Sequence, residues 1–329
     1  MTTKIIKPDS DGILLAKNVL LSGGVIGMPT ETVYGLAGDG TNSSAVKKIF
    51  EVKGRPSDNP LIAHVHKDYD LNKLVIIDQP YVGKIIDTFM PGPITLVLKS
   101  RGVVCSEAVC GGDTLAVRMP SHKDAQNLLK EVNLPIVAPS ANLSKHTSPV
   151  SAEHVYFDLN GKIPLILDGG KCMGGIESTV LDCTAKVPRI LRAGLITKEM
   201  IESLGYGCEI AEHKSTDKVK SPGVKYKHYK PNCETALFYP DQKQEILDFY
   251  RTCELQGKNP YIMCADYEEG FEGLNKLLLG NTPNEIASNL YDRLLYGEKV
   301  AGIIIAVAMP DEKGVNLGIM NRMKKSCGV

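Results

Sequence analysis

Apolar and polar positions over residues 1–210 follow the pattern of a mixed α/β domain. Short apolar runs rich in β-formers predict strands, and longer stretches with helical spacing predict helices between them. So many strands with intervening helices favour a mixed sheet over a helical bundle. The predicted strands cover residues 25–28, 61–65, 94–98, 115–119, 136–138, 165–167 and 179–181, and the predicted helices cover 13–21, 43–52, 81–89, 124–132 and 197–204.

The pattern changes near residue 211. Residues 211–235 are rich in lysine and lack apolar periodicity, which predicts a linker or a segment ordered only by what it contacts. Beyond it, a helix start at residues 282–285, with a capping threonine followed by proline, stands among strand-like runs. We therefore predict a catalytic domain over 1–210, a linker over 211–235 and a small parallel-sheet domain over 236–329.

Composition narrows the class of protein. The chain has 38 Lys+Arg and 38 Asp+Glu, so its zero net charge excludes a globally basic nucleic-acid binder, though not a local basic patch. No apolar run approaches the about 20 residues of a membrane span, and the first residues lack the apolar stretch of a secretory signal. The nine cysteines form no Cys-x-x-Cys pair and have no histidine cluster beside them. Reduced thiols and a cytoplasmic location are the expectation.

Four polar segments beside predicted strands are candidates for a small-molecule site. Residues 29–36 place hydroxyls and a carboxylate at a strand end, where α/β folds bind ligands. Residues 53–64 place Lys53 and Arg55 around a glycine, as a fixed positive charge for phosphate oxygens. Residues 138–149 and 169–180 offer small hydroxyl, amide and glycine positions. Each segment also has a purely structural interpretation, as a polar turn or a solvated loop.

Two arginines strengthen the case for an anionic ligand. Arg118 and Arg192 lie in apolar, strand-like stretches and need anionic partners if they are buried. A protein carboxylate and a substrate carboxylate or phosphate are both open as partners. No Walker-type phosphate loop, catalytic triad or pair of hydrolytic carboxylates is visible. Hydroxyls and cations favour positioning and charge stabilisation over covalent catalysis.

Taken in order, these segments resemble the threonylcarbamoyl-AMP synthase family in its long form. The resemblance implies a YrdC-like mixed, twisted α/β domain followed by a small Rossmann-like parallel α/β domain. It rests on Pro-Thr-Glu-Thr-Val-Tyr-Gly-Leu (29–36), Lys-Gly-Arg-Pro with Asn-Pro-Leu (53–61), Pro-Gly-Pro-Ile-Thr-Leu-Val (91–97), Arg-Met-Pro-Ser-His (118–122), Pro-Ser-Ala-Asn-Leu-Ser (139–144), Glu-Ser-Thr-Val (177–180), Ile-Leu-Arg-Ala-Gly (190–194) and Ser-Pro-Gly-Val-Lys-Tyr-Lys-His-Tyr-Lys-Pro (221–231). The chain departs from the family pattern at Lys145, where a glycine is usual, and at Met90, where a tryptophan is frequent.

The resemblance implies a nucleotidyltransferase, L-threonylcarbamoyladenylate synthase. Its substrates would be L-threonine, bicarbonate and ATP with Mg²⁺, and its products threonylcarbamoyl-AMP and pyrophosphate. A separate transferase would use the adenylate for threonylcarbamoyladenosine modification of tRNA next to the anticodon.

The same resemblance implies roles for individual residues. Lys53 and Arg55 would be catalytic, offsetting charge at the α-phosphate. The threonine site would consist of Thr32, His64, Arg118, the backbone of Ala138 and Ser178. The nucleotide site would consist of Lys53, Arg55, Asn59, Thr114, Ser140, Asn142, Ser148, Arg192, Tyr226 and Tyr229. Linker residues Lys225, Tyr226, His228 and Tyr229 would close over the nucleotide as a lid. No metal ligand is assigned.

Two alternatives remain open at this point. The YrdC-like fold is also associated with double-stranded RNA, and a phosphate-driven RNA binder would need no threonine and would depend steeply on salt. A carbamoyl-adenylate domain serving hydrogenase maturation uses similar chemistry, but that family's accessory zinc and acylphosphatase modules are absent from this sequence. No membrane partner is expected.

Overall fold

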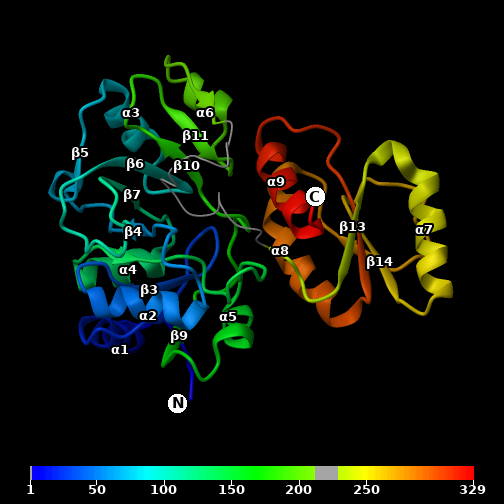
Figure 1. Cartoon of the computed structure of the whole chain (residues 1–329), viewed down its shortest axis with the longest axis horizontal. Coiled ribbons are helices and arrows are strands. Elements are labelled where there is room, and N and C mark those ends of the chain that lie inside the picture. The colour runs from blue at the N-terminus through cyan, green and yellow to red at the C-terminus, as the bar shows by residue number, and fades with distance from the viewer. Residues whose placement is uncertain (1, 212–228) are drawn as a thin grey trace.

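The computed structural model describes residues 2–211 and 229–329. Its described residues form two sheets that lie side by side, with helices between them and on their outer faces (Figure 1). Within these ranges, no helix combines the length and the apolar character that crossing a membrane requires.

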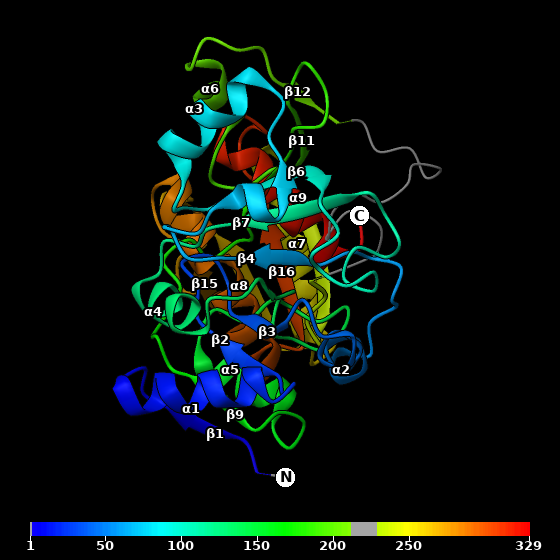
Figure 2. The same ribbon diagram turned by 90° about the vertical axis from the view of Figure 1, so that its left-hand side faces the viewer.

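The first unit is built on a twelve-stranded mixed sheet, counted over the described residues. The strand order is β1-β9-β2-β3-β8-β4-β7-β6-β10-β11-β12, with β5 paired to β6. In Figure 2 this order runs from β1 near the bottom to β12 near the top. The strands are β1 (Lys4–Ile6), β2 (Ile26–Met28), β3 (Gly35–Asp39), β4 (Ile62–His64), β5 (Val75–Ile76), β6 (Ile94–Ser100), β7 (Thr114–Arg118), β8 (Ile136–Val137), β9 (Leu165–Leu167), β10 (Thr179–Asp182), β11 (Arg189–Arg192) and β12 (Glu209–Ile210).

Helices cover both faces of this sheet because neighbouring strand residues point to opposite sides. Ile136 belongs to the apolar cluster beneath two helices, while the adjacent Val137 belongs to the cluster on the other face. The first cluster contains residues of α1 (Ser10–Leu21) and α4 (Lys123–Val132), and the second contains residues of α2 (Ser43–Lys53), α3 (Pro80–Phe89), α5 (Ala152–Leu159) and α6 (Lys198–Glu202).

Helix α2 carries a candidate site residue at its last position, and both of its ends are specified locally. The Asn42 side chain caps the helix, because it accepts hydrogen bonds from the amides of Ser44 (2.9 Å) and Ala45 (3.3 Å). The helix ends at Lys53 because Gly54 takes a left-handed conformation, with φ of 58°. The chain therefore turns sharply between Lys53 and Arg55.

The second unit is a four-stranded sheet in which every pairing is parallel. Helix α7 covers its outer face, and α8 and α9 lie between the two sheets (Figure 1). Thr282 caps α8 in a capping box with Glu285, as its sequence predicts. The elements are β13 (Glu234–Phe238), α7 (Lys243–Leu255), β14 (Pro260–Cys264), β15 (Lys276–Leu278), α8 (Pro283–Val300), β16 (Ile303–Val307) and α9 (Val315–Cys327), and short 3₁₀ turns occupy Leu71–Lys73 and Pro240–Gln242.

The two units share one continuous apolar cluster. It includes Ile176 from the first unit together with Ile286 and Ile319 from α8 and α9. The backbones also approach closely, because a Cβ on Gly175 would lie 2.3 Å from the carbonyl oxygen of Ala287. The predicted fold class is confirmed, since a mixed α/β unit precedes a small parallel one. The apolar run over 300–308 is a strand only from Ile303 to Val307, because α8 continues to Val300.

Candidate active site

One cavity is lined by residues of the first unit together with Tyr229. Its empty space, including the part open to solvent, is about 700 Å³, and polar groups form much of its wall. Strand ends, the end of α2 and the loop after β8 all contribute to it. The predicted site residues that line it are Lys53, Arg55, His64, Arg118, Ala138, Ser140, Asn142, Ser148, Ser178, Arg192 and Tyr229.

His64 and Arg118 form one end of this cavity. They are paired residues at the carboxyl ends of the parallel strands β4 and β7, so the sheet itself holds them together. Arg118 makes an ion pair with Glu31, at 2.7 Å between Nη2 and Oε1. Both side chains are largely buried, at 5% and 13% exposure. The partner of Arg118 in this structure is therefore a protein carboxylate.

His64 is a neutral group at this end of the site. Its Nδ1 lies 3.0 Å from the carbonyl oxygen of Ile62, and the ring is buried. Burial first, and then the charge of Arg118, lower the pKa of His64 to about 3. Because Nδ1 donates to this carbonyl, Nε2 is left as a hydrogen-bond acceptor.

Lys53 supports the loop that follows β8. Its Nζ donates to the carbonyl oxygens of Ser140 and Asn142 and lies 3.4 Å from the Asn142 side-chain oxygen. Burial, reinforced by the charge of Arg55, lowers the pKa of Lys53 well below its usual value. Arg55 is less buried, and its Nη2 donates to the carbonyl oxygen of Asn59 at 3.1 Å. Burial lowers the pKa of Arg55 to about 10, so the guanidinium remains charged near neutral pH.

Glu177 joins the cavity wall to the second unit. It accepts hydrogen bonds from Ser148 (2.7 Å to Oε1) and Tyr291 (3.0 Å to Oε2), and it pairs with Arg322 at 3.1 Å. Burial alone would raise the pKa of Glu177, but the charges of Arg322 and Arg192 lower it to about 2. Arg322 lies on α9 with no exposed surface. A buried side chain of the second unit thus holds a cavity residue in its charged form.

Ser178, the next residue, is held by Arg192 and Thr95. The Arg192 guanidinium donates to the Ser178 carbonyl oxygen at 3.0 and 3.1 Å, and to its hydroxyl at 3.2 Å. Thr95 lies 2.8 Å from the same hydroxyl. Adjacent residues Glu177 and Ser178 are therefore each fixed by an arginine.

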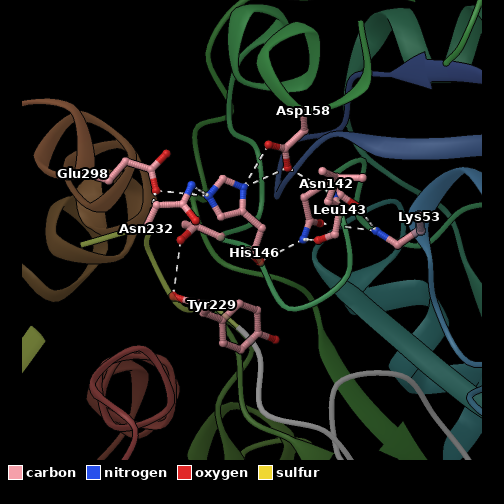
Figure 3. Close-up of polar contacts among 9 residues, drawn as sticks. Lys53, Asn142, Leu143, His146, Asp158, Tyr229, Asn232 and Glu298 are labelled. Atoms are coloured by element: carbon pink, nitrogen blue, oxygen red, sulfur yellow. Dashed lines mark hydrogen bonds and ion pairs between the residues drawn. The ribbon is translucent and has the colours of Figure 1, made fainter. Parts of the chain in front are cut away.

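A second connection between the units centres on His146, another cavity residue. Its ring lies between Asp158 on α5 and Glu298 on α8, and it also faces Asn232 (Figure 3). Close by, the Thr147 hydroxyl donates to the Tyr229 carbonyl oxygen at 3.2 Å. The loop after β8 therefore holds residues 229–232 in place.

The Tyr229 ring lies against protein groups. It stacks on Tyr291 of α8, with ring centroids 5.2 Å apart and an interplanar angle of 28°. Lys325 lies 6.0 Å from the Tyr229 ring centroid. The remaining predicted lid residues, Lys225, Tyr226 and His228, fall outside the described residues, so the lid stays a prediction.

Three predicted site residues that the structure describes do not line the cavity. Thr32 is fully buried, with its hydroxyl 3.0 Å from that of Thr30. Asn59 is also buried and offers its carbonyl to Arg55. Thr114 begins β7, at the opposite end of the strand from Arg118. Their assignment to the ligand sites stays a prediction.

Several cavity or contact residues were not predicted. Glu31 and Glu177 lie within motifs that the sequence singled out, but their arginine partners are distant in the chain. His146 follows Lys145, where the chain departs from the family pattern. Tyr291 and Arg322 sit in helices of the second unit, which carried no visible chemical motif. A buried ionic partner leaves no local signal in a single sequence.

Comparisons with known proteins cover the whole chain. A family model described as telomere recombination matches residues 18–194, and one described as threonylcarbamoyl-AMP synthase, C-terminal domain, matches residues 196–328. The threonylcarbamoyl-AMP synthase of Pyrococcus abyssi is 38% identical over 324 residues, covering 96% of this chain and 94% of that protein. The Bacillus subtilis threonylcarbamoyl-AMP synthase is 39% identical over 328 residues, covering 96% and 93%.

A solved structure agrees with these matches. The crystal structure of P. abyssi Sua5 complexed with L-threonine has a TM-score of 0.90 to this chain and 37% identity, covering 99% of this chain and 96% of that one. Both units and their order along the chain are therefore shared with these relatives. The chain belongs to the threonylcarbamoyl-AMP synthase family, in its long form with a carboxy-terminal domain.

Proposed function

We propose that this protein is an L-threonylcarbamoyladenylate synthase that makes threonylcarbamoyl-AMP and pyrophosphate from L-threonine, bicarbonate and ATP. Family membership over the full length of the chain supports this reaction. The observation that carries it is one cavity lined by His64 and Arg118 at two strand ends and by Lys53 and Arg55 at the end of α2. Such a cavity has an anion-binding group for an amino acid and cations for a nucleotide.

Threonine would bind between the strand ends of β4 and β7. Arg118 offers a guanidinium to the amino-acid carboxylate, which is a charge-assisted contact. Neutral His64 offers Nε2 as an acceptor for the ammonium or hydroxyl of threonine, and Ser178 is held nearby by Arg192. Because Glu31 already pairs with Arg118, the threonine carboxylate would share the guanidinium with it or displace it.

The reaction has two bond-forming steps. Bicarbonate first loses hydroxide to give CO₂, the threonine amine adds to the CO₂ carbon, and the proton that the nitrogen loses combines with the hydroxide as water, which leaves an N-carboxylate. One oxygen of that carboxylate then attacks the α-phosphorus of ATP, and the bond to the bridging oxygen breaks as pyrophosphate leaves with the electron pair. Arg55 and Lys53 would offset the charge that develops in this step. The loop held by Lys53 would position the nucleotide through Ser140 and Asn142.

Mg²⁺ enters this proposal as part of the Mg–ATP substrate. Among the described residues, no group of three or more His, Cys, Asp or Glu side chains could hold a metal ion. Glu177, a buried carboxylate of the cavity, is already paired with Arg322. These residues do not form a site that could coordinate Mg²⁺ through protein ligands alone. Mg²⁺ that is bound by ATP phosphates and water molecules needs few protein ligands. No catalytic step is assigned to a protein-bound metal.

The product would serve tRNA modification. Threonylcarbamoyl-AMP is an activated mixed anhydride, so a separate transferase must accept it to form threonylcarbamoyladenosine next to the anticodon. RNA binding by this chain is a weaker proposal, since no observation in the described residues favours it.

The test is pyrophosphate release from Mg–ATP, with threonine and bicarbonate omitted in turn. We expect release to require both, and threonylcarbamoyl-AMP to form in equal amount when the product is separated by chromatography. Release without threonine and bicarbonate would identify simple ATP hydrolysis and contradict the proposal. No release from folded protein would favour the RNA-binding alternative, which a salt-dependent RNA-binding assay would then examine.

A further inference from the structure

His146 occupies an unusual position between two carboxylates that come from different units. Its Nδ1 lies 2.9 Å from Asp158 Oδ1, and its Nε2 lies 3.0 Å from Glu298 Oε2 (Figure 3). The side chains of His146, Asp158 and Glu298 are only 9%, 5% and 3% exposed. The contacts therefore form in a place where water screens charge poorly.

Both carboxylates also hold backbone at the edge of the cavity. Asp158 Oδ2 accepts the amide hydrogen of Leu143 at 2.9 Å, and Glu298 Oε2 accepts that of Asn232 at 3.0 Å. Leu143 lies in the loop that Lys53 holds through Asn142 (Figure 3). A continuous chain of polar contacts thus runs from α2, through His146, to α8.

Taken together, the two contacts between the ring and the carboxylates favour the charged ring. Only an imidazolium carries hydrogen on both nitrogens and can donate to Asp158 and Glu298 together. If His146 were neutral, the Nε2 lone pair would face the Glu298 oxygen, and the Asn232 side chain, 3.0 Å away, would have to supply a hydrogen instead.

The surrounding charges favour the imidazolium. Burial would lower the pKa of His146, but the hydrogen bonds and charges of Asp158 and Glu298 outweigh it and raise the pKa from 6.5 to about 9. Two further titratable groups of the described residues interact with the charges of this cluster, Lys53 with Asp158 and Cys233 with Glu298. The charged ring therefore predominates at neutral pH.

We propose that His146 is a positioning residue for the nucleotide: by pairing with Asp158 and Glu298 at once, it fixes the loop after β8 against α8 and residues 229–232. The proposal rests on the proposed function, because the loop carries the predicted nucleotide contacts Ser140, Asn142 and Ser148. Loss of the contact with either carboxylate would loosen the wall of the cavity on the nucleotide side. The threonine end, at His64 and Arg118, would stay in place.

The main test is the affinity for ATP in full-length protein, measured by calorimetry at pH 7.5 and across pH 7–10. Glu298→Gln keeps the size of the side chain and removes one carboxylate. We expect ATP to bind on the order of 5–10-fold more weakly, within the range of typical coupling between sites. L-threonine affinity should change less than about 2-fold, because coupling at that level is below this range.

A matched control lies on the same helix. Asp292 of α8 pairs across the units with Lys171 at 3.1 Å, but this pair is more exposed, at 24% and 43%. Asp292→Asn removes the same charge from the same helix and should leave ATP affinity nearly unchanged. Equal losses in Glu298→Gln and Asp292→Asn would mean general loosening of the interface and would overturn the proposal.

The pH dependence distinguishes positioning from simple packing. In the wild type, ATP affinity should fall as the pH rises through about 9, where His146 loses its charge. His146→Gln cannot titrate, so the part of this decline that belongs to His146 should disappear. In Glu298→Gln the decline should move to lower pH, because one of the two carboxylates that stabilise the imidazolium is gone.

A measurement on the wild type keeps the proposal testable if the variants fold poorly. NMR titration of ring-labelled histidine should show a His146 resonance that titrates well above pH 7. A His146 resonance that titrates near or below the usual value of 6.5 would overturn the proposal. The proposed function can fail separately. If ATP affinity depends on the state of His146 but no pyrophosphate is released, only the synthase reaction is contradicted. If pyrophosphate release depends on threonine but ATP affinity does not change with the state of His146, only the positioning role is contradicted.

Discussion

Lys53 and Arg55 are separated by a single glycine, yet the structure places them in different environments. The Lys53 ammonium donates to carbonyl oxygens of the loop after β8, while Arg55, which also lines the cavity, donates from Nη2 to the Asn59 carbonyl oxygen. Gly54 makes this divergence possible through its left-handed turn. Lys53 therefore positions the loop after β8, whereas the guanidinium of Arg55 can approach a phosphate group.

This difference predicts different consequences of removing each charge. Arg55→Ala and Lys53→Ala should each lower kcat by a factor on the order of 10²–10³, the scale of losing one preorganised electrostatic contact. Lys53→Ala should also lower the free energy of unfolding by about 1–3 kcal/mol, because buried carbonyls of Ser140 and Asn142 lose their donor. Steady-state kinetics and urea unfolding measure the two effects.

Lys47→Ala provides the control for these substitutions, since Lys47 is exposed on the same helix and pairs only at the surface with Glu107. It should leave both kcat and stability close to those of the wild type. Wild-type turnover by Lys53→Ala or Arg55→Ala would contradict their catalytic assignment.

The neutral state of His64 predicts an acid-sensitive fold. Its pKa is about 3 in the folded protein, below the 6.5 of an exposed histidine, so the unfolded chain binds the extra proton first. Stability should therefore fall as the pH is lowered from about 6.5 toward 3. Urea unfolding at pH 7, 6, 5 and 4 should show a smaller decline for His64→Asn, which keeps a donor for the Ile62 carbonyl and cannot titrate. Equal slopes for the two proteins would mean that His64 titrates normally in the folded state.

At the scale of elements, periodicity predicted the strands that carry continuous apolar residues. Strand β9 matches its predicted range, residues 165–167, and β4, β6 and β7 lie close to theirs. Strand β3 was missed, because its sequence, Gly-Leu-Ala-Gly-Asp, has little intrinsic strand preference and depends on pairing with β2 and β8. Long-range pairing of this kind cannot be read from a local pattern.

Sequence motifs also indicated many of the residues that line the cavity. Many of these residues belong to motifs at strand ends, where α/β sheets bind ligands, and their roles in binding stay predictions. The contacts across the interface could not be predicted, because Glu177 and Arg322 are 145 positions apart in the chain. Charge complementarity alone does not indicate which of many arginines meets a given carboxylate.

The pairing of Glu177 with Arg322 predicts a strong effect of a substitution far from any ligand. Arg322→Met leaves Glu177 buried without its cation, and breaking a buried pair in this way costs about 3–5 kcal/mol of stability. Without Arg322, Glu177 should no longer be held in place as the acceptor of the Ser148 hydrogen bond. Because Ser148 is a predicted nucleotide contact, the KM for ATP should rise. The double variant Glu177→Gln/Arg322→Met should recover much of the stability, because no charge is then left unpaired. A destabilisation of the double variant that equals the sum of the two single variants would show that the pair is not coupled.

The zero net charge of the whole molecule is compatible with an enzyme that acts on small molecules. Positive and negative residues balance at 38 each, and the arginines of the cavity region are matched in part by buried carboxylates. Lys53 and Arg55, at the end of α2, place two cations beside the cavity, where a polyphosphate could bind.

The interface between the two units predicts how the molecule unfolds as a whole. One apolar cluster contains Ile176, Ile286 and Ile319 from both units, and the Glu177–Arg322 pair is buried within the same contact region. Neither unit can expose its side of this cluster without a large loss of burial, so we expect one cooperative thermal transition in scanning calorimetry, with equal calorimetric and van't Hoff enthalpies. Arg322→Met should weaken the coupling and broaden or divide the transition, whereas Asp292→Asn, at the exposed edge of the interface, should leave it single. Two separate transitions in the wild type would mean that the units fold independently, and the second unit would then support the cavity only as a docked accessory.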